Sequence, residues 1–225
     1  METINYKRLM AKKVTAMLKP YGIKRFRRTE DDLFFIDDQG WFTSIFDFKL
    51  HEGKCEKSVS VSSGIDFNWN LNPILGFNFS DSSGDFLEFT DEKQFSENLI
   101  KLCMETIKKT LEYRNNLMNI KTAEQFILKH KFGIGTTWTN YNRGLISGLA
   151  GNLENLNKYF DKILDMNEKN NRLFYEQEII EIKKNVLELK NIANKDTNKF
   201  TKKIVDIVNK TRELNELDKM KINIK

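Results

Sequence analysis

The stretch from Asn152 to Lys225 contains neither glycine nor proline in 74 residues. Because these two residue types most often mark turns and interrupt helices, the stretch predicts nearly continuous helix. The first half of the chain differs, since twelve of the 17 phenylalanines lie before residue 96, as do both prolines. Aromatic residues favour pleated, half-buried strands, so we expect a sheet there. The chain therefore divides into two parts of different type.

Length and composition exclude several classes of protein. The chain has 225 residues, of which 40% are hydrophobic and 31% charged, enough for a core in one or two domains. No window approaches about 18 consecutive apolar residues, and the opening METINYKRLMAKK lacks the apolar centre of a secretory signal. Cys55 and Cys103 are the only cysteines and have no metal-ligand companions. We expect a reduced, cytoplasmic protein without cofactor or membrane contact, of undetermined oligomeric state.

Alternation of apolar and polar residues predicts the strands of the first half. Between Trp41 and Leu50, Phe46 and Phe48 fall on one face, and Asp47 and Lys49 on the other. Strands are predicted at 24–28, 33–36, 41–50, 58–62, 75–79 and 86–89. Residues 37–40 read as a hairpin loop with Gly40 available for positive φ. One apolar and one polar face are typical of an antiparallel sheet covered on one side.

Helical spacing predicts the remaining elements. The first helix contains Tyr6 to Leu18 and is stopped by Pro20 and Gly22. In the second helix, Thr90 is the expected cap, and the predicted core-facing stripe is Phe95, Leu99, Leu102, Cys103, Ile107 and Leu111. Further helices are predicted at 123–131, 145–164, 173–192 and 200–217, the last capped by Asp196. The predicted fold is an α+β antiparallel-sheet domain with flanking helices at 1–118 and an all-α bundle or hairpin at 119–225.

A carboxylate and lysine pattern suggests one enzymatic alternative. Asp37 ends a strand, and Asp47 and Lys49 share a face of the next strand. This resembles the (D/E)xK arrangement of nucleases, in which the acids hold Mg²⁺ and the lysine positions a water. A solvent-facing strand shows the same alternation, so we favour no catalytic residue and keep the nuclease as an alternative.

Other catalytic and ligand-binding motifs are weak. His51 and His130 lie far apart and match no zinc motif. Gly133 to Gly135 lacks the Lys-Ser/Thr ending of a phosphate loop and is interpreted as a hinge. Gly144 and Gly148 form a small-residue face, which we interpret as a site of tight packing inside the protein.

Tryptophans and charge indicate where partners would bind. Trp41 and Trp69 are candidate partner-binding residues, because tryptophan is enriched at binding hot spots, although each can instead plug the edge of a core. Residues 1–118 have a net charge of −1 and residues 119–225 a net charge of +6. The basic half leaves nucleic-acid binding through the C-terminal helices as a second alternative.

The order of features in the first half is similar to one known family. The matching segments are 19–23 (KPYGI), 26–28 (FRR), a hairpin, and 59–66 leading into 67–70 (FNWN). These resemble a family of uncharacterised bacterial α+β domains, the domain-of-unknown-function group numbered four-three-zero-four. Some small bacterial domains of this kind lie near toxin, immunity or phage-defence genes, so the resemblance implies a binding role in bacterial conflict. It brings no characterised active site. Because no nucleophile, metal or phosphate motif is convincing and long amphipathic helices offer docking surface, the leading hypothesis is a non-enzymatic protein-binding module.

Overall fold

In the part of the chain that the structure describes, six strands form one antiparallel sheet in the first half, and helices make up most of the rest. The computed structural model describes residues 5–26, 33–53, 56–69, 79–83, 86–130, 136–166 and 176–224. The strands are β1 (Lys24–Phe26), β2 (Phe34–Asp38), β3 (Phe42–Glu52), β4 (Lys57–Phe67), β5 (Phe79–Ser83) and β6 (Leu87–Glu88). The helices are α1 (Tyr6–Leu18), the 3₁₀ turn η1 (Lys19–Tyr21), α2 (Glu92–Leu117), α3 (Ile120–Lys129), α4 (Thr136–Leu149), α5 (Leu153–Leu164), α6 (Glu176–Lys195) and α7 (Thr197–Leu214). The α+β prediction is confirmed.

The strands follow the order β1-β2-β3-β4-β5, and β6 also pairs with β4. The longest pairing joins β3 and β4 over eleven residues, from Phe42 opposite Phe67 to Glu52 opposite Lys57. Side chains alternate between the two faces of a strand, so Phe46 and Phe48 share a face with Val59 and Val61. This is the helix-covered face. The opposite face carries the alternate positions of the same strands.

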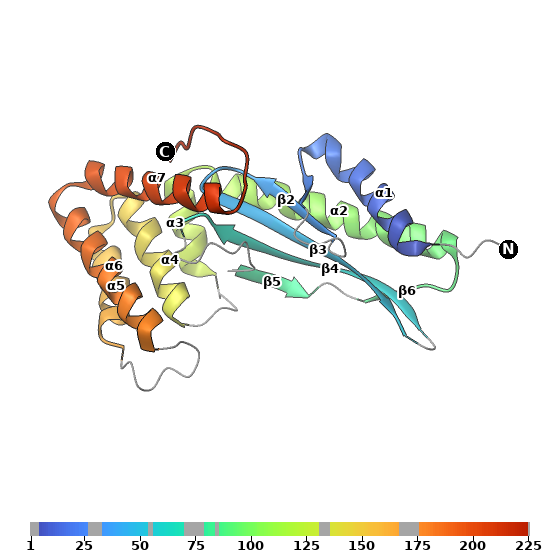
Figure 1. Cartoon of the computed structure of the whole chain (residues 1–225), viewed down its shortest axis with the longest axis horizontal. Coiled ribbons are helices and arrows are strands. Elements are labelled where there is room, and N and C mark those ends of the chain that lie inside the picture. The colour runs from blue at the N-terminus through green and yellow to red at the C-terminus, as the bar shows by residue number, and fades with distance from the viewer. Residues whose placement is uncertain are drawn as a thin grey trace.

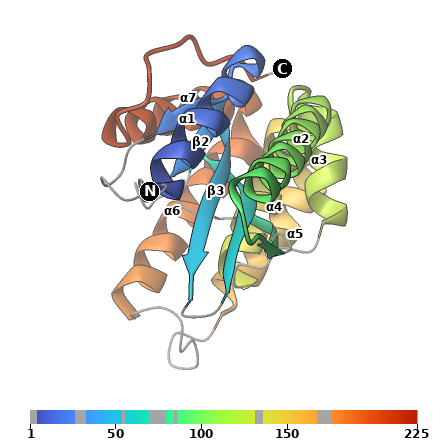
Figure 2. The same cartoon turned by 90° about the vertical axis from the view of Figure 1, so that its right-hand side faces the viewer.

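Helices α1 and α2 pack on the same side of the sheet (Figure 2). Their buried residues join the strand phenylalanines in one core that includes Met10, Val14, Phe95 and Leu99. Pro20 in η1 and Gly22, with φ of 78°, end the first helical segment as expected. Asp91, one residue after the predicted Thr90, caps α2 by accepting a hydrogen bond from the Gln94 N–H at 2.8 Å. The prediction that these two helices cover the sheet is therefore confirmed.

The predicted loop at 37–40 is shorter in the structure. Strand β2 continues through Asp37 and Asp38, which pair with Ser44 and Thr43 of β3. The turn consists of the residues between Asp38 and Phe42, and Gly40 has φ of 91°. The side chain of Asp38 accepts a hydrogen bond from the Gly40 N–H at 3.1 Å. Two acidic residues that resemble a loop are thus part of the strand.

The helical half contains one more break than predicted. The expected helix over 145–164 is two helices, α4 and α5, separated at Gly151, which has φ of 80°. Asn152 caps α5 through a hydrogen bond from the Asn155 N–H. Asp196 caps α7 as predicted, accepting hydrogen bonds from the Asn198 and Lys199 N–H groups at 3.0 Å. Predicted features at 27–32, 70–78, 131–135 and 167–175 lie outside the described residues.

The two halves share one buried cluster, which contains Phe46 and Leu99 as well as Leu145 and Phe200. In Figure 1 the sheet runs across the right and centre, while α4 to α7 gather at the left end. The small-residue face of α4 is a close contact, as predicted. A Cβ added at Gly148 would lie 2.3 Å from Leu156 Cδ1 and 2.7 Å from the Phe200 ring. The domain boundary at residue 118 stays a prediction.

Candidate functional site

The structure does not bring Asp37, Asp47 and Lys49 together. Asp37 pairs with Ser44 of β3, and Asp47 lies three residues further along that strand. An odd separation places the two carboxylates on opposite faces of the sheet. Asp37 points to the helix-covered face, where it is only 1% exposed. Two acids separated in this way do not share a metal ion.

Asp37 has a structural partner. Arg114 of α2 donates from Nε to Asp37 Oδ2 at 3.0 Å and from Nη2 to Oδ1 at 2.7 Å. The hydrogen bonds from Arg114 to Asp37 raise the pKa of the guanidinium above its ordinary value. Arg114 also donates to the carbonyl of Tyr21. The side chain therefore ties the C-terminal part of α2 to both β2 and η1.

Asp47 and Lys49 do lie on the same face, as the period of the strand predicts. Lys49 Nζ is 3.1 Å from Asp47 Oδ2. On the same face, His51 Nε2 is 3.1 Å from the hydroxyl of Ser60, and the His51 ring packs against Phe86. Within the described ranges, no group of three His, Cys, Asp or Glu side chains is arranged to hold a metal ion. This face presents an ion pair and a Ser–His hydrogen bond.

Trp41 and Trp69 are buried, with 3% and 0% of their surface exposed. Their rings stack on each other with centroids 5.0 Å apart, and Phe67 stacks on Trp69 at the same distance. Trp69 Nε1 donates to Asn142 Oδ1 of α4 at 2.9 Å. Both rings therefore belong to the core, which is the alternative that the sequence left open beside a partner contact. Through the hydrogen bond to Asn142, Trp69 links the sheet to the helical half. The stacked rings also bury a large apolar area.

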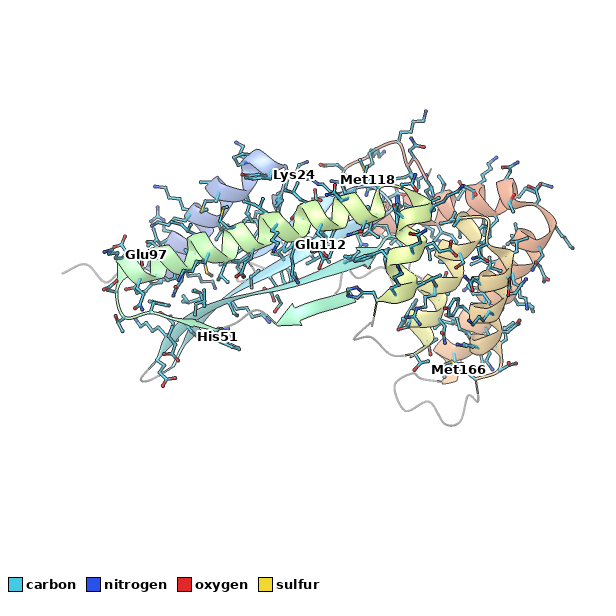
Figure 3. All side chains as sticks on the ribbon, turned by 180° about the vertical axis from the view of Figure 1, so that it is seen from behind. Lys24, His51, Glu97, Glu112, Met118 and Met166 are labelled. Atoms are coloured by element: carbon cyan, nitrogen blue, oxygen red, sulfur yellow. The ribbon has the colours of Figure 1, made fainter. Side chains whose placement is uncertain are left out.

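Among the described residues, the largest row of exposed apolar side chains lies instead along α2 and its C-cap residue, Met118. Met104 and Met118 are 57% and 55% exposed, and Ile100 and Leu111 are 50% and 45% exposed. Leu111 was expected to face the core. We call these four residues the α2 stripe. From Ile100 to Met118 it spans 19 residues, a rise of about 27 Å at 1.5 Å per residue. Figure 3 shows α2 in front of the sheet, with Glu97, Glu112 and Met118 along it, and no other described helix crosses in front of it.

Comparison with known proteins finds no match: no family model, curated protein or solved structure is significantly similar to the chain. The resemblance to the uncharacterised bacterial family therefore stays a prediction. Within the described residues, no helix combines the length and the apolar character needed to cross a membrane. The candidate site rests on the geometry of the α2 stripe.

The stripe follows the seven-residue period of a helix-pairing seam. Met104, Leu111 and Met118 are seven residues apart, and Ile100 and Ile107 occupy the intervening seam position. Ile107 is buried at the inner border of the stripe. A sequence signal for the stripe exists, since these five residues fit a heptad seam. It is obscured by the second apolar pattern on α2, which supplies the core-facing side and shares Ile107 with the seam.

Proposed function

We propose that the chain is a protein-binding module and that the α2 stripe receives an amphipathic helix of the partner. The observation that carries the proposal is the exposure of about half of each of four large apolar side chains in one row on one helix. An apolar row of this kind on a folded protein marks an interaction surface. The spacing favours a helical partner, whose own apolar residues would insert between those of the stripe.

The position of α2 in the fold supports a preformed binding surface. The side of α2 turned to the core is fixed by Phe95, Leu99 and Leu102, which belong to the central cluster. Arg114 holds the last turns of the helix against Asp37. A rigid helix needs little reordering when a partner binds, which lowers the entropic cost of association.

The charges beside the stripe indicate the chemistry of the partner. Lys101 and Lys108 occupy the positions directly next to the seam on its solvent side and are exposed, and Glu105 and Glu112 follow one turn later, further from the seam. Cys103 and Thr110, on the other side, are buried in the core. Two copies of α2 paired antiparallel about a twofold axis would place Lys108 opposite its own copy, which is unfavourable. The surface therefore favours a different protein with glutamate or aspartate beside its apolar seam.

The proposal can be tested with a synthetic helix that has leucine at the seam positions and glutamate beside them. We expect the wild-type chain to bind this peptide and to bind a lysine-flanked version more weakly. Replacing Met104 and Leu111 by glutamate should abolish binding. The matched control makes the same change to glutamate at Ile180 and Leu187 of α6, which are 42% and 50% exposed. Equal binding by both double variants, or equal binding of the two peptides, would contradict the proposal.

A role in bacterial conflict and a cytoplasmic location are proposals that rest on the resemblance and on the composition. The test for the first is gene context. A toxin or defence gene beside the coding sequence would support it, and its product would be the first partner to test. That test uses purified product with the wild-type chain and with the Met104→Glu/Leu111→Glu variant. Binding that the variant retains would place the contact elsewhere.

A further inference from the structure

We propose that the face of β1, β2 and β3 turned away from α1 and α2 is a binding site for a peptide segment in which aspartate follows leucine. In the structure this site is occupied by residues 217–224 of the same chain, which we call the tail segment and which follow α7 as a coil (Figure 1). A partner peptide of the same chemistry would displace the tail segment. The site is on the other side of the sheet from α2, so the proposal does not depend on the α2 stripe.

The apolar part of the site is a small cluster separate from the central core. Ile36 of β2 and Ile45 of β3 are opposite each other in the sheet and are 6% and 3% exposed. Phe26 and Phe34 pack beside them. Within the described residues, Leu217 of the tail segment is the one member of this cluster that does not come from the sheet. Leu217 therefore covers a row of apolar strand residues that would otherwise face solvent.

The polar part of the site consists of two basic side chains that bind the next residue, Asp218. Lys24 Nζ donates to Asp218 Oδ2 at 2.8 Å, and Arg212 Nη2 donates to the Asp218 carbonyl oxygen at 2.6 Å. Arg212 is only 3% exposed and is also held by Asp38. The site therefore recognises an apolar side chain, a carboxylate and a backbone carbonyl on two successive residues.

Several features make the tail segment displaceable. Residues 218–224 belong to no helix or strand, and among the described residues none of their backbone N–H groups donates to a backbone carbonyl. The side chains of Lys24 and Asp218 are 72% and 79% exposed, so water and salt weaken their ion pair. Glu216, at the junction with α7, has φ of 54°, a left-handed conformation that is unfavourable for a residue with a Cβ. Release of the tail segment frees Glu216 from this conformation.

The tail segment also leaves space on the site. A pocket of about 260 Å³ lies between it and the strands, and Phe26, Ile36 and Met220 are among its lining residues. Further along, Ile222 and Ile224 are only partly buried against the central core. A partner with larger apolar side chains would bury more of this surface. Because the tail segment is tethered, its effective concentration is high, and only a tighter or locally concentrated partner would replace it.

The test measures fluorescence anisotropy of a labelled peptide with the sequence of residues 215–224, added to the full chain. The wild type should bind weakly, because its own tail segment competes. The Leu217→Ser/Asp218→Lys variant lacks this competitor and should bind about tenfold more tightly or better. In that background, Lys24→Glu should weaken binding and favour a peptide with lysine in place of the aspartate. The matched control, Lys12→Glu, reverses the same charge at an exposed position of α1 and should change neither.

A second variant tests the junction with α7. Glu216→Gly removes the penalty of the left-handed conformation and so favours the occupied state. It should bind the labelled peptide about twofold to fivefold more weakly than the wild type does. Tighter binding by Glu216→Gly would contradict the proposed release of the tail segment.

Other outcomes would overturn the proposal. These are equal or absent binding in the wild type and the Leu217→Ser/Asp218→Lys variant, and equal binding of a peptide with serine in place of the leucine. A dimer of this variant that the peptide does not dissociate in sedimentation would show that a second copy covers the face instead. Circular dichroism checks that each variant is folded. If the double variant does not fold, Asp218→Ala removes the ion pair alone, and an unchanged affinity there would equally refute the site.

Discussion

Replacing Gly144 by alanine should change the free energy of unfolding through two effects of opposite sign. In the interior of a helix, alanine is favoured over glycine by about 1 kcal/mol. In α4, however, the new Cβ would lie 2.3 Å from Cε1 and 2.4 Å from Cδ1 of the Phe160 ring. Both distances are more than 1 Å shorter than an ordinary van der Waals contact of about 3.5–4.0 Å. One of the two helices, or the ring, must move.

The surroundings of Phe160 limit that movement. The ring is fully buried, belongs to the central cluster and stacks on Tyr141 at 6.3 Å. Inserting a methyl group into a packed core costs about 1–3 kcal/mol, and the depth of this overlap places the cost near the upper end. After the gain in helix propensity, we expect a net loss of about 2 kcal/mol in the free energy of unfolding. At 2–4 °C per kcal/mol for a chain of this size, Tm should fall by about 4–8 °C.

Urea unfolding followed by far-ultraviolet circular dichroism and tryptophan fluorescence measures this loss. The Phe160→Leu background supplies the control, because the smaller side chain leaves room for the methyl group. There, Gly144→Ala should be close to neutral, giving a coupling energy of about 1–2 kcal/mol in the double-mutant cycle. Asn115→Ala, at an exposed position of α2, is the control for a helix-favouring substitution that meets no steric conflict, and it should not destabilise the chain. A Gly144→Ala variant more stable than wild type, or equally destabilised in both backgrounds, would refute the close packing of α4 on α5.

Three further predictions concern stability and reactivity. Arg212→Met removes the partner of Asp38, to which Arg212 Nη2 donates at 2.9 Å. Leaving that carboxylate unpaired should lower the free energy of unfolding in urea by about 3–5 kcal/mol. A loss below about 1 kcal/mol would contradict this prediction. Glu216 has φ of 54° at the end of α7, so Glu216→Gly should raise the stability by about 0.5–1 kcal/mol, whereas Glu216→Ala should not. Burial raises the pKa of the Cys103 thiol to about 12; in a Cys55→Ser background it should react with iodoacetamide at pH 8 only as fast as the protein unfolds, and labelling within seconds in native buffer would disprove its burial.

Much of the fold could be predicted because its signals are local. The alternation around Phe46 and Phe48 gives the faces of β3, and Asp196 and Gly22 mark helix ends through their own side-chain or backbone chemistry. The break between α4 and α5 also had a local signal, since a glycine in the left-handed conformation followed by Asn152 as a cap ends one helix and starts another. The helical spacing of apolar residues continues across that break, and this spacing predicted a single helix.

The parts that could not be predicted depend on residues far apart in the chain. Asp37 looks like a loop residue until Arg114, 77 residues later, is known to reach it. The sequence left Trp69 open between a partner contact and a core position. Its stacking partner Trp41 and its acceptor Asn142, which decide for the core, lie far from it in the chain. The α2 stripe required knowing which side of α2 faces the sheet. The helical spacing of apolar residues alone placed Leu111 on the core-facing side, whereas it is exposed.

The contact between Arg212 and the β2–β3 turn can form only late in synthesis, because the two lie far apart in the sequence. Arg212 donates to Asp38 and to the carbonyl of Gly40, across 174 and 172 residues of sequence. At a translation rate of about 5–20 residues per second, Arg212 is added roughly 9–35 s after Asp38. The strands can pair long before then. Asp38, at the tip of the β2–β3 hairpin, has no Arg212 partner until almost the whole chain has been made. A truncated product that ends before α7 would therefore leave the ribosome with this hairpin unfinished.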